Sequence, residues 1–427
     1  MDTMLITEME AAFRSEVHLA GSDLGTLERA VCDRLRSWGR DLLQRLLDYT
    51  SQQRSSAPLS CSCGGPFHLQ GYRPRQIQSL LGAVTIRRAY LCCPQCGTRR
   101  IPYDQASGLG PCQISPGLAR ACSVVAVDES FASTARKVEA LTGQRVSPKT
   151  IERVAEQVGA AALAQQEAAW NQFQQTREPP REEQTPTRLY IAVDGTTVHE
   201  QDGWHESKVA AESWEDPRKN RQVRYVGRFS DSEFFGQQVW AQACRWGFRT
   251  APEVVYLGDG AGWIRTLQHQ WFSRATFIID WYHASEHVWD CGKVLHGEGT
   301  EATEHWVKRK VDLLWAGQTR PLLLDLEDQI RHHRGTKRAA LTALHRYIAD
   351  HEDQMQYDQF RARGYSIGSG EAEGACKHLV GRRLKQSGMI WSRKGSSAIL
   401  ALRIAWLNRE WDALWKSNPL QFIRPAV

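Results

Sequence analysis

The sequence lacks any apolar run long enough to form a transmembrane helix. Its N-terminal segment is amphipathic and acidic, without the apolar stretch of a secretory signal. Internal repeats and low-complexity tracts are also missing, which argues against a solenoid or a disordered tail. We therefore expect a cytoplasmic protein with no membrane partner. In that reducing compartment the eleven Cys should be thiols or metal ligands rather than disulfides.

Acidic residues are missing from one long stretch. Residues 374–403 carry seven Lys or Arg and no Asp or Glu, although the net charge of the chain is only +6. Positive charge that is concentrated in this way favours contact with nucleic acid more than a mild net charge does. Most of the 16 Trp are expected in the core, with a minority available to stack on bases.

The order of patterns along the 427 residues predicts two or three domains. Helical spacing and a Cys-bearing module come first, then helices joined by tight turns and a polar linker, then alternating strands and helices. The predicted boundaries are 1–56 for an N-terminal helical region, 57–112 for a zinc-ribbon-like module, 113–175 for a helix-turn-helix-like DNA-binding region, 176–188 for the linker, 189–283 for the first part of an α/β core, 284–366 for an all-helical insertion, and 367–427 for the last core helix with a basic C-terminal region.

The α/β core is expected to be ribonuclease-H-like, because three antiparallel strands precede an alternation of helix and strand. In that topology the first and fourth strands are neighbours, so their ends meet at one edge of the sheet. The expected strands are Leu189–Val193, His205–Ala211, Val223–Phe229, Glu253–Leu257 and Thr276–Ile279, and the expected helices are Ser232–Trp246 and Ala261–Trp271.

Asp194 and Asp259 close the apolar runs of the first and fourth strands. Carboxylates at neighbouring strand ends repel one another, and a divalent cation usually resolves the repulsion. Mg²⁺ (or Mn²⁺) suits such a site because it takes a few carboxylates together with phosphate oxygens, which indicates phosphodiester chemistry. The alternative is that each Asp-Gly pair merely starts a turn.

A third acid is expected from the start of the last helix, where Glu371 and Glu373 follow Gly368-Ser369-Gly370. The two side chains point about 200° apart on a helix, so only one can face the aspartates. The other would gain from its place at the helix N-terminus. The spacing alone leaves the choice open.

Basic residues in two regions are expected to contact DNA phosphates. The break at Gly143 and the helix start at Ser147-Pro148 are typical of a helix-turn-helix. The usual alternative for a charge run is a solvated face, and the lack of acids favours DNA. The expected DNA contacts are Lys149, Arg153, Lys377, Arg382, Arg383, Lys385, Arg393 and Lys394.

Two close cysteine pairs predict a structural Zn²⁺ site. Cys61 and Cys63 are separated from Cys93 and Cys96 by a strand-rich span, which suits tetrahedral zinc. Cys-Pro-x-Cys is a strong signal, whereas Cys-x-Cys is tighter than usual, and Cys92 is a possible substitute. Reduced buried thiols are the alternative.

The segment from His283 to His287 matches the His-x-x-Glu-His pattern of some zinc peptidases. Five residues are weak evidence in a chain with 14 His. A supporting role is favoured, in which Asp280 at a strand end braces His283 at the base of the carboxylate cleft.

At these residues the chain resembles DDE transposases of bacterial insertion sequences, namely the Kra-type insertion-element family and, more distantly, Mutator-like transposases. The resemblance covers nearly the whole chain. It rests on the Cys module and on the segments 190–196, 257–261, 280–287, 368–370 and 381–389. It implies Asp194, Asp259 and, three places after the Gly-Ser-Gly, Glu373 as the catalytic, Mg²⁺-binding residues. It also implies an all-helical insertion before that Glu and a motif that matches Asp280 and His283.

The expected function is therefore that of a DNA transposase. It would bind element ends, cut and join strands with Mg²⁺, and work in the cytoplasm at the nucleoid as a homo-oligomer that holds two ends together. One alternative is a transposase-derived DNA-binding protein without catalysis. A zinc peptidase built on His283, Glu286 and His287 is the other.

Overall fold

The computed structural model describes Ala11 and residues 23–54, 60–107, 109, 113–368, 370–417 and 419–421. The chain divides into two units, residues 1–161 with 413–427, and residues 162–412. Among the described helices, none has the length and apolar character needed to cross a membrane. Apart from Ala11, the part of the N-terminal helical region before residue 23 lies outside the described residues.

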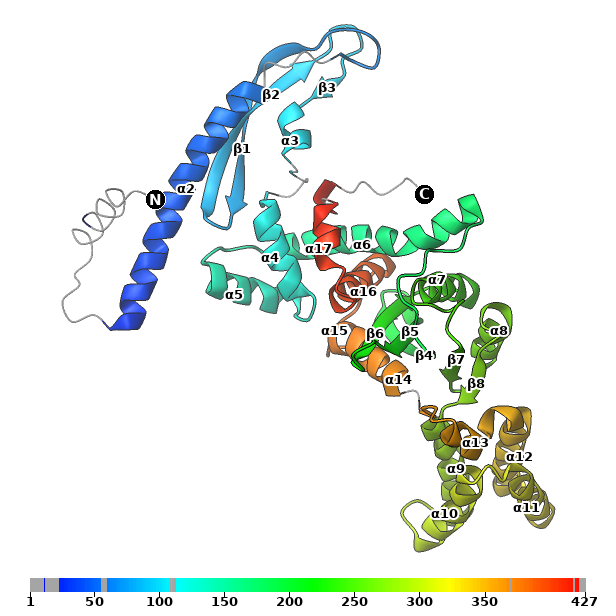
Figure 1. Cartoon of the computed structure of the whole chain (residues 1–427). Coiled ribbons are helices and arrows are strands. Elements are labelled where there is room, and N and C mark those ends of the chain that lie inside the picture. Colours follow the sequence, from blue (N-terminus) through cyan, green and yellow to red (C-terminus); the bar gives the residue numbers. More distant parts are fainter. Residues whose placement is uncertain are drawn as a thin grey trace. The chain divides into compact units, whose positions relative to one another are not determined.

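The first unit contains an antiparallel sheet with the order β1-β2-β3 (Figure 1). Its strands are β1 (His68–Ser79), β2 (Gly82–Cys92) and β3 (Arg99–Arg100). The long helix α2 (Leu24–Arg54) packs on β2. Gln44 of α2 hydrogen-bonds both the backbone N–H and the C=O of Thr85, each at 2.8 Å. This contact fixes the helix against the strand.

Helices follow the sheet in the order α3 (Pro102–Ala106), α4 (Pro116–Ala126), α5 (Phe131–Thr142) and α6 (Pro148–Thr176). The predicted break is confirmed, because α5 ends at Gly143 with a left-handed φ of 71°. The predicted start is also confirmed, because the Ser147 hydroxyl accepts the Thr150 N–H at 3.2 Å and Pro148 opens α6. The short turn η3 (Pro419–Gln421) belongs to the same unit.

The second unit is built on a mixed five-stranded sheet with the order β6-β5-β4-β7-β8 (Figure 1). The strands β4, β5 and β6 are antiparallel, whereas β7 and β8 run parallel to β4. The bounds are β4 (Arg188–Glu200), β5 (Gly203–Glu215), β6 (Arg221–Arg228), β7 (Glu253–Gly258) and β8 (Thr276–Ile279). All five expected strands are present, and β4 and β5 are longer than the sequence indicated. The connections use α7 (Ser232–Arg245) and α8 (Gly262–Trp271).

A group of helices separates β8 from the last part of the unit (Figure 1). It enters at Trp281 and leaves at Ile367, and the Trp281 N–H donates to the Ile367 C=O at 2.9 Å. The first and last residues of this long segment therefore touch. The bounds are α9 (Trp281–His296), α10 (Glu301–Trp315), α11 (Thr319–His332), α12 (Gly335–Asp350), η1 (Glu352–Met355) and α13 (Tyr357–Ala362).

The predicted last core helix forms in three consecutive pieces. They are α14 (Gly370–Ala375), the π-helical turn η2 (Cys376–Gly381) and α15 (Arg382–Leu384). α14 packs on β4 and β5, and η2 packs on β4. A π turn holds an extra residue per turn, so it changes which side chains face the sheet. After it come α16 (Arg393–Leu407), which packs on β6, and α17 (Trp411–Lys416).

Candidate active site and metal centre

Asp194 and Asp259 lie at the same level of the sheet, Asp194 within β4 and Asp259 directly after the end of β7. The prediction that Asp194 closes its strand is wrong, because the pairing of β4 with β5 continues to Glu200. Their strands β4 and β7 are parallel neighbours, and Ala192 pairs with Leu257. Each aspartate comes two residues after its member of that pair, on strands about 4.8 Å apart. Both side chains are half-buried. The Asp259 carboxylate is fixed by the backbone N–H of Ala261, at 2.7 Å.

The surroundings of Asp194 raise the pKa of its carboxyl group. Burial is the largest cause, and the negative charge of Asp259 acts in the same direction. The Gly195 N–H at 2.7 Å, a hydrogen bond from the Cys376 thiol and the charge of His283 oppose the increase. Asp194 is thus close enough to Asp259 to feel its charge. A carboxylate in such a place gains from a cation.

Asp280 occupies the same level on the third parallel strand. Gly258 of β7 pairs with Ile279 of β8, so Asp280 follows β8 as Asp259 follows β7. Its side chain is buried and accepts the backbone N–H of His283 at 2.8 Å, which caps α9. Asp280 therefore fixes the backbone at His283, and the supporting role of this pair stays a prediction.

Glu371 is held away from Asp194. Its carboxylate accepts Arg221 Nε at 2.7 Å and the Ser213 hydroxyl. Ser213 pairs with Tyr190, four residues before Asp194 on β4. Four strand residues span about 13 Å. Glu371 thus belongs to the β5–β6 side of the sheet.

Glu373 is exposed and lies on the side of the helix that carries Cys376. Burial raises the pKa of the Cys376 thiol, and the charges of Asp194 and Glu373 add to the increase. The Cys376 thiol therefore lies within electrostatic range of both Asp194 and Glu373. Asp194, Asp259 and Glu373 do not form a group whose ligand atoms all lie within 4.8 Å of one another, among the residues that the structure describes.

The basic segment formed by η2, α15 and Lys385 reaches the same part of the sheet as Asp194. Lys385 Nζ donates to the Thr196 hydroxyl at 3.0 Å. Thr196 comes two residues after Asp194, so both side chains are on one side of β4. Lys377 of η2 and Arg382 of α15 are exposed. These three cations are accessible for the expected phosphate contacts.

Arg383 requires a correction, because its side chain is completely buried. Its guanidinium approaches the Met389 sulfur at 3.7 Å and lies 5.0 Å from the ring centre of Trp391. The expected DNA contact is wrong for this residue, which packs inside the unit. Arg393 is half-exposed and pairs with the buried carboxylate of Glu200 at 2.9 Å.

The remaining expected cations are exposed. Lys149 lies in the first turn of α6 and pairs with Glu152 at 2.9 Å. Arg153 is exposed one turn later, and Lys394 is exposed at the start of α16. Exposed ion pairs such as that of Lys149 are weak and exchange easily for phosphate contacts.

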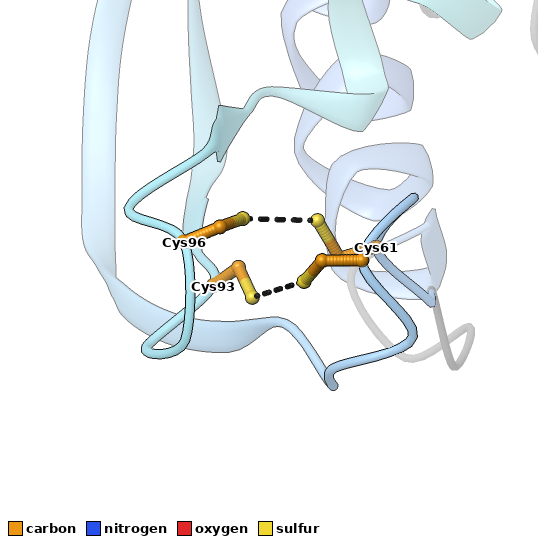
Figure 2. Close-up of side chains that lie close together, drawn as sticks. Cys61, Cys93 and Cys96 are labelled. Carbon is orange, nitrogen blue, oxygen red and sulfur yellow. Dashed lines mark hydrogen bonds between the residues drawn. The ribbon is translucent and has the colours of Figure 1, made fainter.

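The predicted cysteine quartet comes together in the first unit (Figure 2). The sulfur atoms of Cys61, Cys63, Cys93 and Cys96 all lie within 4.8 Å of one another. Cys61 is 3.4 Å from Cys96, and Cys63 is 3.5 Å from Cys93. Tetrahedral zinc with Zn–S bonds of about 2.3 Å places sulfur atoms about 3.8 Å apart. The donor set therefore fits Zn²⁺ with little adjustment.

Hydrogen bonds favour the thiolate form, which binds zinc, at Cys61 and Cys96 and oppose it at Cys63. The Gly65 N–H lowers the pKa of Cys63, but hydrogen bonds with the other three thiols outweigh it and raise that pKa to about 12. The Cys63 N–H, followed by neighbouring thiols, lowers the pKa of Cys61 to about 6. The Thr98 hydroxyl and N–H lower the pKa of Cys96. Cys92 does not substitute, because its sulfur is directed to the backbone carbonyls of Cys93 and Gly97.

The two histidines of the His-x-x-Glu-His segment differ in environment. His283 Nδ1 lies 3.7 Å from Glu286, and its charge acts on Asp194. The His287 ring packs against Tyr347 with centroids 3.9 Å apart and ring planes tilted by 34°, and burial lowers the pKa of His287. In the described chain, groups of three close potential ligands do not include this segment.

Several residues near the carboxylates were not predicted from the sequence. Cys376 follows Glu373 by three residues, a spacing that places both on one helix side. Tyr347 donates its hydroxyl to the Asp259 C=O at 3.1 Å, and His351 Nε2 lies 3.3 Å from the Gly260 C=O. Nothing in the sequence pattern marks these two side chains, because their contacts depend on how α12 packs.

Comparison with known proteins gives a family but no activity. Residues 21–413 match the model of UPF0236, described as an uncharacterised protein family. The chain is similar to the "UPF0236 protein in vanSb 3'region" of Streptococcus gallolyticus, with 24% identity over 364 residues. That similarity covers 81% of this chain and 75% of the relative.

Proposed function

We propose that this chain, which belongs to the uncharacterised protein family UPF0236, is a metal-dependent DNA transposase of the DDE type. The observation that carries the proposal is the common level of Asp194 and Asp259 on adjacent parallel strands. The strand order β6-β5-β4-β7-β8 supports a ribonuclease-H-like core, in which acids at this level of the central strands would form the reactive centre.

Asp194, Asp259 and Glu373 would hold Mg²⁺ or Mn²⁺, which when bound activates water or a 3′-hydroxyl for in-line attack on phosphorus. The engagement of Glu371 by Arg221 and Ser213 supports Glu373 as the third acid. Glu373 is exposed, and therefore accessible both to solvent and to a substrate.

Other residues would position the substrate and the acids. Lys385 and the exposed Lys377 and Arg382 would contact phosphates beside β4, where Lys385 already reaches Thr196. Asp280 fixes the backbone at His283, whose charge acts on Asp194. These contacts would keep the acids in place as charge develops on the phosphate.

The first unit would recognise the ends of the mobile element. Its cysteine quartet would hold Zn²⁺ for structure alone, because four protein ligands leave no open position for chemistry. Lys149 and Arg153 at the start of α6 would contact DNA, as in a helix-turn-helix. A homo-oligomer at the nucleoid is part of the proposal, since two ends must be held together for joining.

The test uses DNA that contains the gene of this protein with its own flanking sequence, where the ends of an insertion element would lie. The purified full-length protein is incubated with this DNA and Mg²⁺, and new strand ends and joints are mapped by sequencing. We expect defined cuts and joints with the wild type, and a loss of at least a thousandfold with Asp194→Asn, Asp259→Asn or Glu373→Gln.

Glu371→Gln is the matched control, because it makes the same chemical change two residues from Glu373. It should keep cleavage, and circular dichroism should show that all variants are folded. Cleavage that persists in Asp194→Asn would refute the catalytic assignment. Specific binding without any cleavage by the wild type would instead support the inactive DNA-binding protein.

A further inference from the structure

A second cluster of positive charge lies on the helical insertion. Residues 331–349 contain five Lys or Arg and no Asp or Glu. All five are exposed. They are Arg331, Arg334, Lys337, Arg338 and Arg346. The nearest acids along the chain are Asp328, three residues before Arg331, and Asp350, four residues after Arg346. Asp350 lies 3.7 Å from Arg346, and both members of that ion pair are more than half exposed. Such a pair gives little stability and does not prevent Arg346 from binding another anion.

One face of α12 forms a shallow depression of about 680 Å³. Arg338 and Arg346 lie along it, and the residues between them on this face are Ala339, Thr342 and Ala343. Small side chains between two arginines let a bulky chain approach the helix closely. The arginines are eight residues apart, which is about 12 Å along a helix. One DNA strand places a phosphate every 3.4 Å or so along the axis, so the pair would span about three to four phosphates.

The depression ends beside Asp259. Tyr347, Asp350 and His351 line its end. Tyr347 contacts the backbone C=O of Asp259 at 3.1 Å, and His351 contacts that of Gly260 at 3.3 Å. Gly260 has a φ of 87°, and a Cβ there would lie 2.8 Å from His351 Nε2. The end of α12 is therefore packed tightly against the turn that carries Asp259.

We propose that this face of α12 binds the phosphodiester backbone of DNA and directs it to Asp259. The inference rests on the proposed function for the identity of the reaction, and it adds a binding surface on the insertion. Arg338 and Arg346 are the main contacts, because a guanidinium can bind a phosphate through two hydrogen bonds. The contact would be independent of base sequence. An acidic protein segment is the competing occupant, and it is an outcome of the test.

The test measures binding of the full-length protein to a 30-base-pair duplex of arbitrary sequence over a range of salt concentrations, with Ca²⁺ in place of Mg²⁺. Each lost phosphate contact should reduce the slope of log K against log salt by about 0.9. Arg338→Ala with Arg346→Ala should therefore reduce it by about 2 and weaken binding by about tenfold per arginine. The double variant with Lys at both positions should keep the slope.

Lys308→Ala with Arg309→Ala is the matched control, because both residues are exposed on α10 of the same insertion and the loss of charge is equal. It should leave the slope unchanged. An equal change in both double alanine variants would overturn the proposal, since the effect would then be one of general charge. An unchanged slope in the α12 variant would also overturn it and would leave cleavage by Asp194 and Asp259 intact as a separate result.

Absence of cleavage by the wild type would reject the proposed function. The salt dependence of binding would still test the α12 surface in that case. A wild type that binds no duplex at any salt concentration would reject both. Competition by polyglutamate that is as strong as competition by DNA, and that depends on Arg338 and Arg346, would assign the surface to an acidic protein partner instead.

Discussion

The cysteine quartet and the proposed carboxylate site differ in how their residues are brought together. All four sulfur atoms lie within 4.8 Å of one another, and they come from two short turns next to one antiparallel sheet. The acids come from β4, from the end of β7 and from α14, which are separated by up to about 180 residues of sequence. Thiols can donate hydrogen bonds to one another and cluster, whereas carboxylates repel. The first site depends on local turns, and the second depends on how the sheet is ordered.

The largest expected effect is at the cysteine quartet. Cys93→Ser should remove one equivalent of zinc per chain and unfold the module, because zinc binding supplies much of the folding free energy of such sites, about 10 kcal/mol or more. Metal content is measured by mass spectrometry, and unfolding by limited proteolysis. Cys92→Ser is the control and should keep its zinc. Equal loss of zinc in both variants would mean that the quartet has been assigned incorrectly.

The second prediction concerns the proposed carboxylate site, whose residues come from distant parts of the sequence. Saturating Mg²⁺ should stabilise the second unit by about 2.7 kcal/mol at a hundred times the dissociation constant, which raises the melting temperature by a few degrees. The increase should disappear in Asp194→Asn and be smaller in Glu373→Gln. Glu371→Gln should retain it, measured by calorimetry. A full increase in Asp194→Asn would show that the cation binds elsewhere.

The smallest effect concerns a carboxyl group of the same sheet that faces the core. Glu212 of β5 is completely buried, and neither of its carboxyl oxygens has a hydrogen-bond partner in the described structure. Burial raises its pKa well above the usual value, and Arg245 opposes this only in part. Because the folded-state pKa exceeds the unfolded one, stability falls as the pH rises from about 4.3 through the folded-state value.

Glu212→Met should therefore stabilise the protein by about 1–2 kcal/mol at pH 8 and by less at pH 5. Urea unfolding at the two pH values measures the difference. Glu215→Met is the control, because this exposed Glu lies on the same strand and should change stability by less than about 0.5 kcal/mol. The same gain at both pH values would show that ionisation of Glu212 is not the cause.

Much of this arrangement could be predicted from sequence, because the signals are local. The apolar runs before Asp194 and Asp259 mark two strands, although β4 continues past Asp194 to Glu200, and the cysteine pairs mark two turns. Arg383 could not be placed, since its burial against Trp391 depends on how the chain folds back after α15. The π turn at Cys376–Gly381 and the contact of Tyr347 with Asp259 likewise arise from packing. The basic run at 331–349 was visible in the sequence, but only the position of α12 connects it with the acids.

The hydrogen bond between Trp281 and Ile367 has a consequence for how such a chain can vary. Because the helical group begins and ends at neighbouring residues, its length does not affect the spacing of the sheet elements on either side of it. Insertions and deletions within α10 and α11 would change the reach of this group while Asp194 and Asp259 keep their level. Relatives of this chain can thus differ in the size of the helical group and still share one arrangement of acids.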